Sequence, residues 1–144
     1  MGLVLDSGPL RPGPFLWTLP YTLLGVLLAL LSGTRPRYHR GLFIALSDRG
    51  FAHLFLTRRG FVAMTLGRVI LTTRPLTMAT WVHELVHVQQ YERWGPLFLP
   101  LYLWWHVRRG YQENPFERAA AAVAARLCQE APDRAAAQIW PPAL

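Results

Sequence analysis

The chain has 144 residues, enough for one domain with a single modest core. Its 15 basic residues are all arginine and outnumber 8 acidic ones, which gives a formal charge of +7; because these arginines are scattered and accompany no nucleic-acid-reading motif, we expect no nucleic-acid partner. The single cysteine, Cys128, excludes an internal disulfide and a CxxC metal site.

The N-terminal part combines a stretch of helix-breaking residues with a long apolar one. Residues 1–14 are rich in glycine and proline and are predicted to form a flexible leader. Residues 15–34 carry no charged side chain, and as one helix they would extend about 30 Å, the thickness of a bilayer core, so a membrane anchor is one interpretation. Pro20 favours a second, a shorter helix that lies in the core or at a membrane surface, and a cleaved signal peptide is the third.

The charges next to the apolar segment bear on where the protein resides. Three arginines lie within residues 35–40, and such residues are enriched on the cytoplasmic side of membrane proteins. A spanning helix would therefore leave the following chain in the cytoplasm. We expect a cytoplasmic protein, or one associated with the inner membrane through residues 15–34.

Residues 41–73 change character. They hold short runs of aromatic and β-branched residues, among them FAHLFLT and RVILTT, separated by turns that contain glycine. This pattern predicts a meander of antiparallel strands, with His53 as a structural residue in one of them. The strand that directly precedes residue 77 is expected to form an open sheet edge, with which an extended peptide could pair.

Residues 77–95 read TMATWVHELVHVQQYERWG and contain an HExxH motif in a helical context. Residues four apart share one helix face, so His83 and His87 can offer two imidazole nitrogens to a single metal ion. Glu84 lies beside them, placed to take a proton from a metal-bound water. Two ordinary half-buried histidines are the alternative, which would leave Glu84 as a buried carboxylate without a partner.

Residues 96–107, PLFLPLYLWWHV, are apolar on every side and too short to span a membrane. They are predicted either to pack beneath the active site or to lie against lipid. In the second arrangement Trp104 and Trp105 would act as interfacial anchors, with two arginines directly after them.

A catalytic zinc site needs a third protein ligand. The candidates downstream of the motif are Glu92, His106, Glu113 and Glu117. Glu92 points away from the histidine face. Glu117 lies at the start of a predicted helix that runs to about residue 131, and the residues that follow it on the same helix face are almost all small and apolar. Such a stripe allows close approach of two helices. Asn114 and Glu117 also match a capping box, in which the glutamate only bonds the backbone amide of the cap residue.

The sequence HELVHVQQYERWG followed by GYQENPFERAA resembles the gluzincin zinc metallopeptidases, most closely small bacterial domains of the minigluzincin type with HExxH and NPxE motifs. The resemblance covers residues 41–131. It implies one Zn²⁺ ion per chain held by His83, His87 and Glu117, with Glu84 as general base and the edge strand as the cradle for a peptide or protein substrate.

The expected fold is therefore α+β. A small antiparallel meander packs on the HExxH helix and a C-terminal helix, preceded by a hydrophobic helix. The metallopeptidase domain is expected over residues 35–131, with residues 132–144 as a C-terminal tail. Larger members of the resembled family steady the oxyanion with a tyrosine or histidine from a further subdomain, which residues 1–144 lack. The candidates for that role here are Tyr91, His106 and Tyr111.

These features predict a zinc-dependent hydrolase that cleaves peptide bonds. One alternative is a catalytically inactive, zinc-binding scaffold or interaction protein, associated with a membrane through residues 15–34. The other is a small membrane or interaction module that binds no zinc.

Overall fold

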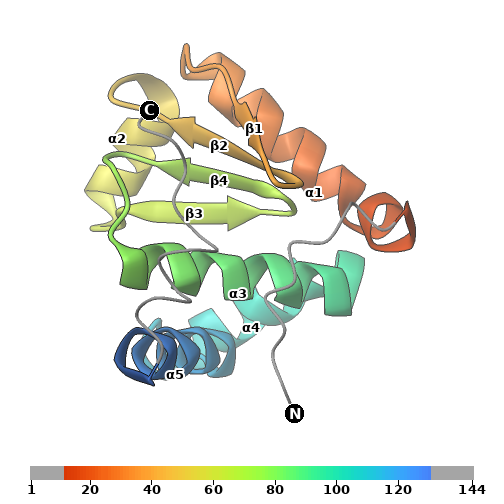
Figure 1. The fold of residues 1–144 in the computed structure, drawn as a ribbon, viewed down its shortest axis with the longest axis vertical. Helices are drawn as coiled ribbons and strands as arrows, with labels where there is room; N and C mark the ends of the chain where they lie inside the picture. The colour runs from red at the N-terminus through yellow and green to blue at the C-terminus, as the bar shows by residue number, and fades with distance from the viewer. Residues whose placement is uncertain (1–11, 131–144) are drawn as a thin grey trace.

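The computed structural model describes residues 12–130, which form a four-stranded mixed sheet and five α-helices (Figure 1). The expected α+β fold is confirmed. In chain order the elements are α1 (Pro12–Leu31), β1 (Arg37–His39), β2 (Leu42–Leu46), α2 (Gly50–Arg58), β3 (Ala63–Leu66), β4 (Val69–Thr72), α3 (Met78–Trp94), the 3-10 helix η1 (Gly95–Leu97), α4 (Phe98–Arg109) and α5 (Pro115–Glu130).

The predicted terminal segments fall largely outside this range. The C-terminal tail, residues 132–144, lies outside the described residues, as does the leader up to residue 11. Residues 12–14, also assigned to the leader, form the start of α1.

The sheet is not the predicted antiparallel meander. Its strand order is β1-β2-β4-β3, and β2 pairs with β4 in parallel. The run FAHLFLT, predicted as a strand, forms α2 because its buried residues Ala52 and Leu56 are four apart and therefore share one helix face. His53 thus lies on a helix, where its Nδ1 donates to the carbonyl of Ser47 at 3.1 Å.

The open edge of the sheet is also not where it was expected. The strand directly before the HExxH helix, β4, pairs with both β2 and β3 and is internal. The described sheet has two edge strands, β1 and β3, and β3, which contacts the HExxH helix, pairs with β4 alone. Any extended peptide added to this side of the sheet would therefore pair with residues 63–66.

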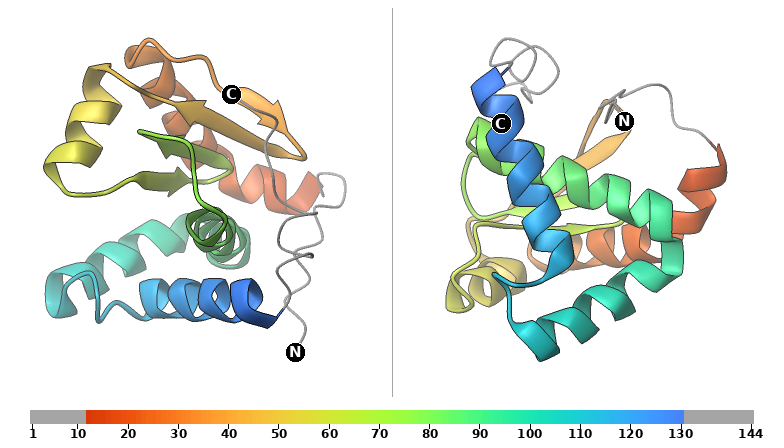
Figure 2. Two further views of the ribbon diagram at one scale, coloured as in Figure 1. Left: turned by 60° about the vertical axis from the view of Figure 1, so that its left-hand side comes forward. Right: turned by 90° about the horizontal axis from the view of Figure 1, so that it is seen from below.

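Side chains alternate between the two faces of the sheet, both faces are apolar, and different helices pack on each of them. Residues such as Leu42, Ile44 and Ile70 point toward α3 and α5, whereas Ala45, Val69 and Leu71 point toward α1 and α2. Figures 1 and 2 show α3 between the sheet and α5. The HExxH helix is therefore fixed from both sides.

The apolar segment near the N-terminus forms most of α1, and the helix continues through Pro20 instead of beginning there. Among the described helices none is long and apolar enough to cross a membrane.

The β3–β4 turn lies directly on α1, which makes Gly67 sensitive to substitution. Its φ is +59°, and a Cβ there would approach the backbone nitrogen of Thr22 to 2.6 Å. We expect Gly67→Ala to lower the free energy of unfolding by about 2–4 kcal/mol, since backbone strain and a steric clash add. Gly60→Ala is the matched control, because its φ is +74° with nothing within 4 Å, and should cost only about 1 kcal/mol. Urea unfolding measures both; equal losses would contradict the clash.

Candidate metal centre

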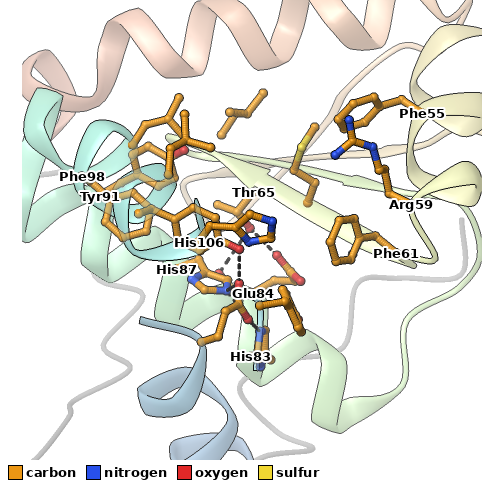
Figure 3. A pocket seen from close by; sticks show the side chains of 18 residues that line it. Phe55, Arg59, Phe61, Thr65, His83, Glu84, His87, Tyr91, Phe98 and His106 are labelled. Carbon is orange, nitrogen blue, oxygen red and sulfur yellow. Dashed lines mark hydrogen bonds and ion pairs between the residues drawn. The ribbon is translucent and has the colours of Figure 1, made fainter. Parts of the chain in front are cut away.

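The central helix α3 carries His83, Glu84 and His87 along one side of a pocket (Figure 3). It is capped at its N-terminus by Thr77, whose hydroxyl accepts a hydrogen bond from the Thr80 amide, and at its C-terminus by Gly95, which has a positive φ. These ends fix the helical turn that separates the two histidines. Their Nε2 atoms lie 3.1 Å apart.

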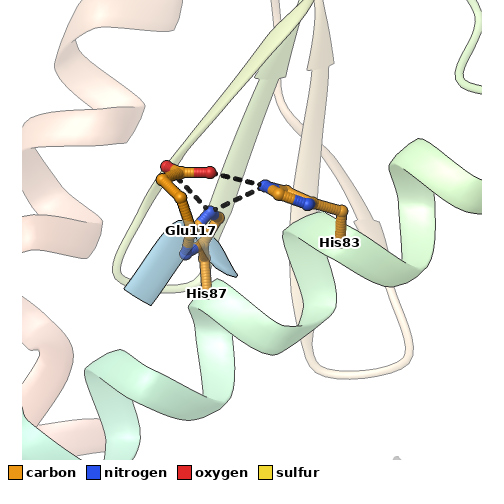
Figure 4. Close-up of side chains that lie close together, drawn as sticks. All are labelled: His83, His87 and Glu117. Carbon is orange, nitrogen blue, oxygen red and sulfur yellow. Dashed lines mark hydrogen bonds and ion pairs between the residues drawn. The ribbon is translucent and has the colours of Figure 1, made fainter. Parts of the chain in front are cut away.

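Glu117 completes the cluster from the first turn of α5 (Figure 4). Its Oε2 lies 2.9 Å from His83 Nε2, and its Oε1 lies 3.3 Å from His87 Nε2. The capping-box alternative is wrong, because the Asn114 amide donates to the carbonyl of Tyr111 and not to Glu117. Asn114 does cap the helix, since its Oδ1 accepts from the amide of Phe116.

The three ligand atoms fit around a single cation. The candidate atoms of His83, His87 and Glu117 all lie within 4.8 Å of one another, and this cluster could hold a metal ion. Ligand atoms arranged tetrahedrally at about 2.0–2.2 Å from a zinc ion lie roughly 3.3 Å apart, close to the separations found here. Three protein ligands are also the number that leaves a coordination position for water or substrate.

The remaining candidates for the third ligand do not join the cluster. Glu92 forms an ion pair with Arg68 at 2.6 Å, and Glu113 pairs with the exposed Arg118 at 3.4 Å. His106 lies in the wall of the same pocket, where its ring stacks on Tyr102. Glu117 is thus the carboxylate that the structure brings to the two histidines.

Hydrogen bonds around the cluster orient its ligands. The Gln90 side-chain nitrogen donates to the Phe116 carbonyl, which turns the Gln90 oxygen toward His87 Nδ1 at 2.8 Å. Nδ1 therefore carries the proton of the neutral ring, and Nε2 keeps its lone pair for the metal. The Tyr102 hydroxyl donates to Glu117 Oε1.

Charges within the cluster attract a cation, which can be a metal ion or a proton. Burial raises the pKa of Glu117, but hydrogen bonds from His83 and His87 lower it by more, so its pKa lies well below the ordinary value. Burial lowers the pKa of His87, yet Glu117 and Glu84 raise it above its usual value. Glu117 is therefore ionised near neutral pH, and a proton on His87 would compete with a metal ion.

Glu84 lines the same pocket as the ligand cluster and contacts the edge strand β3. Its Oε2 accepts a hydrogen bond of 2.7 Å from the Thr65 hydroxyl, and the side chain is buried. Burial raises the pKa of Glu84 by more than His87 and Thr65 lower it. Thr65 is thus a partner for this carboxylate, so the expectation that ordinary histidines would leave it without one is wrong, and Glu84 is a base whose proton affinity exceeds that of an exposed glutamate.

The pocket is a cavity of about 210 Å³ bounded by β3, α2, α3, α4 and α5. All three candidates for the oxyanion role line it. Tyr91 is fully buried against Phe98, and Tyr111 packs on Phe61. His106 has a buried Nδ1 without a hydrogen-bond partner among the described residues. The role itself stays a prediction for each of them.

Three contributors were not anticipated from the sequence: Thr65, Gln90 and Tyr102. Gln90 follows His87 by three residues, so helical spacing alone could have indicated it. Tyr102 and His106 are side chains with polar end groups, four residues apart in an otherwise apolar segment, and this spacing could have indicated that both face the site. Thr65 carried none, because its partner depends on how β3 meets α3.

Models of protein families, curated proteins and solved structures were each compared with this chain, and none matches. The likeness to gluzincins therefore stays a resemblance carried by the two motifs. The geometry of His83, His87, Glu117 and Glu84 is the basis for assigning a function.

Proposed function

We propose that the protein is a zinc-dependent metallopeptidase. The observation that carries the proposal is the convergence of His83, His87 and Glu117 from two helices, with the buried carboxylate of Glu84 beside them. Each residue type matches one requirement of metal-assisted hydrolysis.

Zinc is the metal that this donor set favours. Two imidazole nitrogens and one carboxylate form a common catalytic zinc site, and calcium or magnesium would favour oxygen ligands alone. When bound, zinc would act as a Lewis acid and lower the pKa of a coordinated water from about 15.7 to roughly 7. The hydrogen bonds from His87 to Gln90 and from Tyr102 to Glu117 would hold the ligands in place.

Glu84 would serve as the general base. A base works best when its pKa lies near the working pH, and burial raises the pKa of Glu84 in that direction. The hydroxyl of Thr65 orients one carboxylate oxygen and leaves the other available to accept a proton.

The substrate would be an extended peptide. The cavity runs beside β3, and residues 63–66 contribute to its wall. The unpaired edge of this strand offers backbone groups for pairing with a peptide, while apolar walls such as Phe61 and Met64 would receive an apolar side chain.

The full chain loaded with one equivalent of zinc is expected to cleave members of a peptide library, detected by mass spectrometry. Removing the metal with a chelator should abolish cleavage, and restoring zinc should return it. Zinc binding without cleavage would favour an inactive zinc-binding scaffold. Cleavage that persists after complete removal of the metal would contradict the proposal.

Tyr102→Phe is expected to lower zinc affinity by about 10–100-fold, because the carboxylate of Glu117 loses the donor that orients it. Burial, together with the hydrogen bond to Glu117, raises the pKa of Tyr102, so the hydroxyl keeps its proton and can donate. Competition with a chromogenic chelator measures the affinity. Tyr38→Phe, at an exposed position on β1, should leave it unchanged.

A further inference from the structure

Helix α1 has two different sides, and its more apolar side faces outward. In a helix that lies between a protein core and water, the apolar side faces the core. The buried positions on the side that faces the protein are small or weakly polar, namely Thr18, Thr22, Gly25 and Ala29, and the partly buried Val26 and Leu28 pack beside them. The side that faces outward is lined with leucines that are 41% to 67% exposed: Leu16, Leu23, Leu24, Leu27, Leu30 and Leu31. A helix between a protein core and water carries its leucines inward, so this face of α1 is suited to contact with something apolar.

Two further helices repeat the pattern. Large exposed apolar side chains lie along α4 with the preceding η1 and along α2: Leu97, Leu103, Trp104, Val107, Phe51, Leu54 and Phe55. By contrast, the exposed side of α5 carries alanines and the ion-paired Arg118 and Arg126. We refer to the outward apolar residues of α1, α2 and α4, with Leu97, as the apolar face.

The three helices adjoin one another. The Tyr21 hydroxyl of α1 donates to the carbonyl of Pro96, just before α4, at 2.7 Å. At the other end of α1, the Ser32 hydroxyl accepts from the amide of Ala52 in α2 at 2.8 Å. Figure 2 shows α2 and α4 on the same side of the molecule. The exposed apolar area thus exceeds the scattered side chains of an ordinary surface.

Arginines border this area and stack on its aromatic residues. The guanidinium of Arg108 lies 4.7 Å from the ring of Trp104, that of Arg109 lies 4.8 Å from Trp105, and that of Arg59 lies 5.4 Å from Phe55. None of these three arginines forms an ion pair within residues 12–130. Their charges remain available to an external anion.

We propose that the apolar face docks on the surface of a lipid bilayer that contains anionic headgroups. Leucine and tryptophan side chains would enter the acyl boundary, while the adjoining arginines would contact lipid phosphates. The charge distribution favours this occupant over a second copy of the chain, because two apolar faces brought together would also bring their unpaired arginines together. The net charge of +7 acts in the same direction.

Docking would also place the mouth of the cavity at the membrane. Phe55 and Leu103 belong both to the apolar face and to the cavity wall. Peptide segments tethered to or emerging from the bilayer would then be the substrates. This consequence rests on the proposed peptidase function, whereas docking itself does not.

Co-sedimentation of the full chain with vesicles tests the docking. We expect binding to phosphatidylcholine vesicles that contain phosphatidylglycerol, and weaker binding to pure phosphatidylcholine. Leu23→Glu, Leu27→Glu and Leu30→Glu together should weaken binding by about 100-fold or more. Arg108→Gln with Arg109→Gln should weaken binding to the anionic vesicles by about 25-fold and leave the other vesicles unaffected.

The matched control adds the same charges to α5. Ala121→Glu, Ala122→Glu and Ala125→Glu should bind anionic vesicles within about fivefold of the unchanged chain. Val107, which is 84% exposed, allows a substitution that the fold tolerates, and Val107→Glu alone should weaken binding about tenfold. Circular dichroism checks the fold of each variant.

Three results would overturn the proposal: no binding of the unchanged chain to anionic vesicles, equal losses in the α1 and α5 variants, or a lipid-free dimer in ultracentrifugation that the leucine variants abolish. Vesicle binding requires neither zinc nor cleavage, so its failure would leave the peptidase proposal standing.

Discussion

Replacing Glu84 by glutamine is expected to lower kcat/KM for peptide hydrolysis by about 10²–10⁴-fold while one zinc ion stays bound per chain. Glutamine keeps the size of the side chain and can still accept the hydrogen bond from Thr65. It cannot take up a proton near neutral pH. Only proton transfer is removed, because Glu84 does not belong to the ligand cluster.

The measurement pairs kcat/KM with the zinc content of the same sample. Glu113→Gln provides the matched control, since this glutamate is exposed and its partner Arg118 lies at the surface; its activity should equal that of the unchanged chain. Unchanged hydrolysis by the Glu84 variant would remove Glu84 from the role of general base. Loss of zinc along with activity would assign Glu84 a role in holding the metal.

The histidine pair was predictable from the sequence because it depends on local geometry. Any helix through residues 83–87 places His83 and His87 on one face, whatever surrounds it. The position of Glu117 was predictable in part. Asn114 and Pro115 mark the start of α5, and the small residues Ala120 and Ala124 are buried where α5 approaches α3.

The arrangement of the sheet was not predictable in the same way. The run FAHLFLT is short, and its apolar residues fit a buried strand as well as a helix. Only the structure, in which Ala52 and Leu56 are buried on one face of α2, shows that the run is a helix. Strand order depends on pairing between distant segments. The insertion of β4 between β2 and β3 left no trace in the local pattern, which is why β4 was wrongly expected at the edge.

The outward leucines of α1 show a different limit. Composition identified the segment as apolar, but it could not say which side of the helix faces the protein. The structure shows that Thr18, Thr22 and Gly25 face inward while leucines such as Leu23 and Leu27 are exposed, so the segment adds less to the core than its composition implied. Which side of a helix is exposed depends on the tertiary arrangement.

Replacing Glu117 by alanine is expected to lower zinc affinity by more than about 100-fold. This loss is larger than that expected for Tyr102→Phe, which removes only a hydrogen-bond partner of the ligand. Two imidazoles remain, and they lack the negative charge that the carboxylate contributes. Hydrolysis at a fixed low zinc concentration should fall in parallel. Glu117→Gln separates charge from size, because it keeps a side-chain oxygen but lacks the charge, and should bind zinc more weakly than the unchanged chain.

Competition with a chelator of known affinity measures the zinc constants, and Glu113→Gln again serves as control. If zinc affinity were unchanged in the Glu117 variants, another residue would have to supply the third ligand, and His106 is the remaining candidate in the cavity wall. A His106→Ala variant distinguishes the two assignments. With Glu117 as ligand, this variant should bind zinc as tightly as the unchanged chain, because His106 lies outside the ligand cluster.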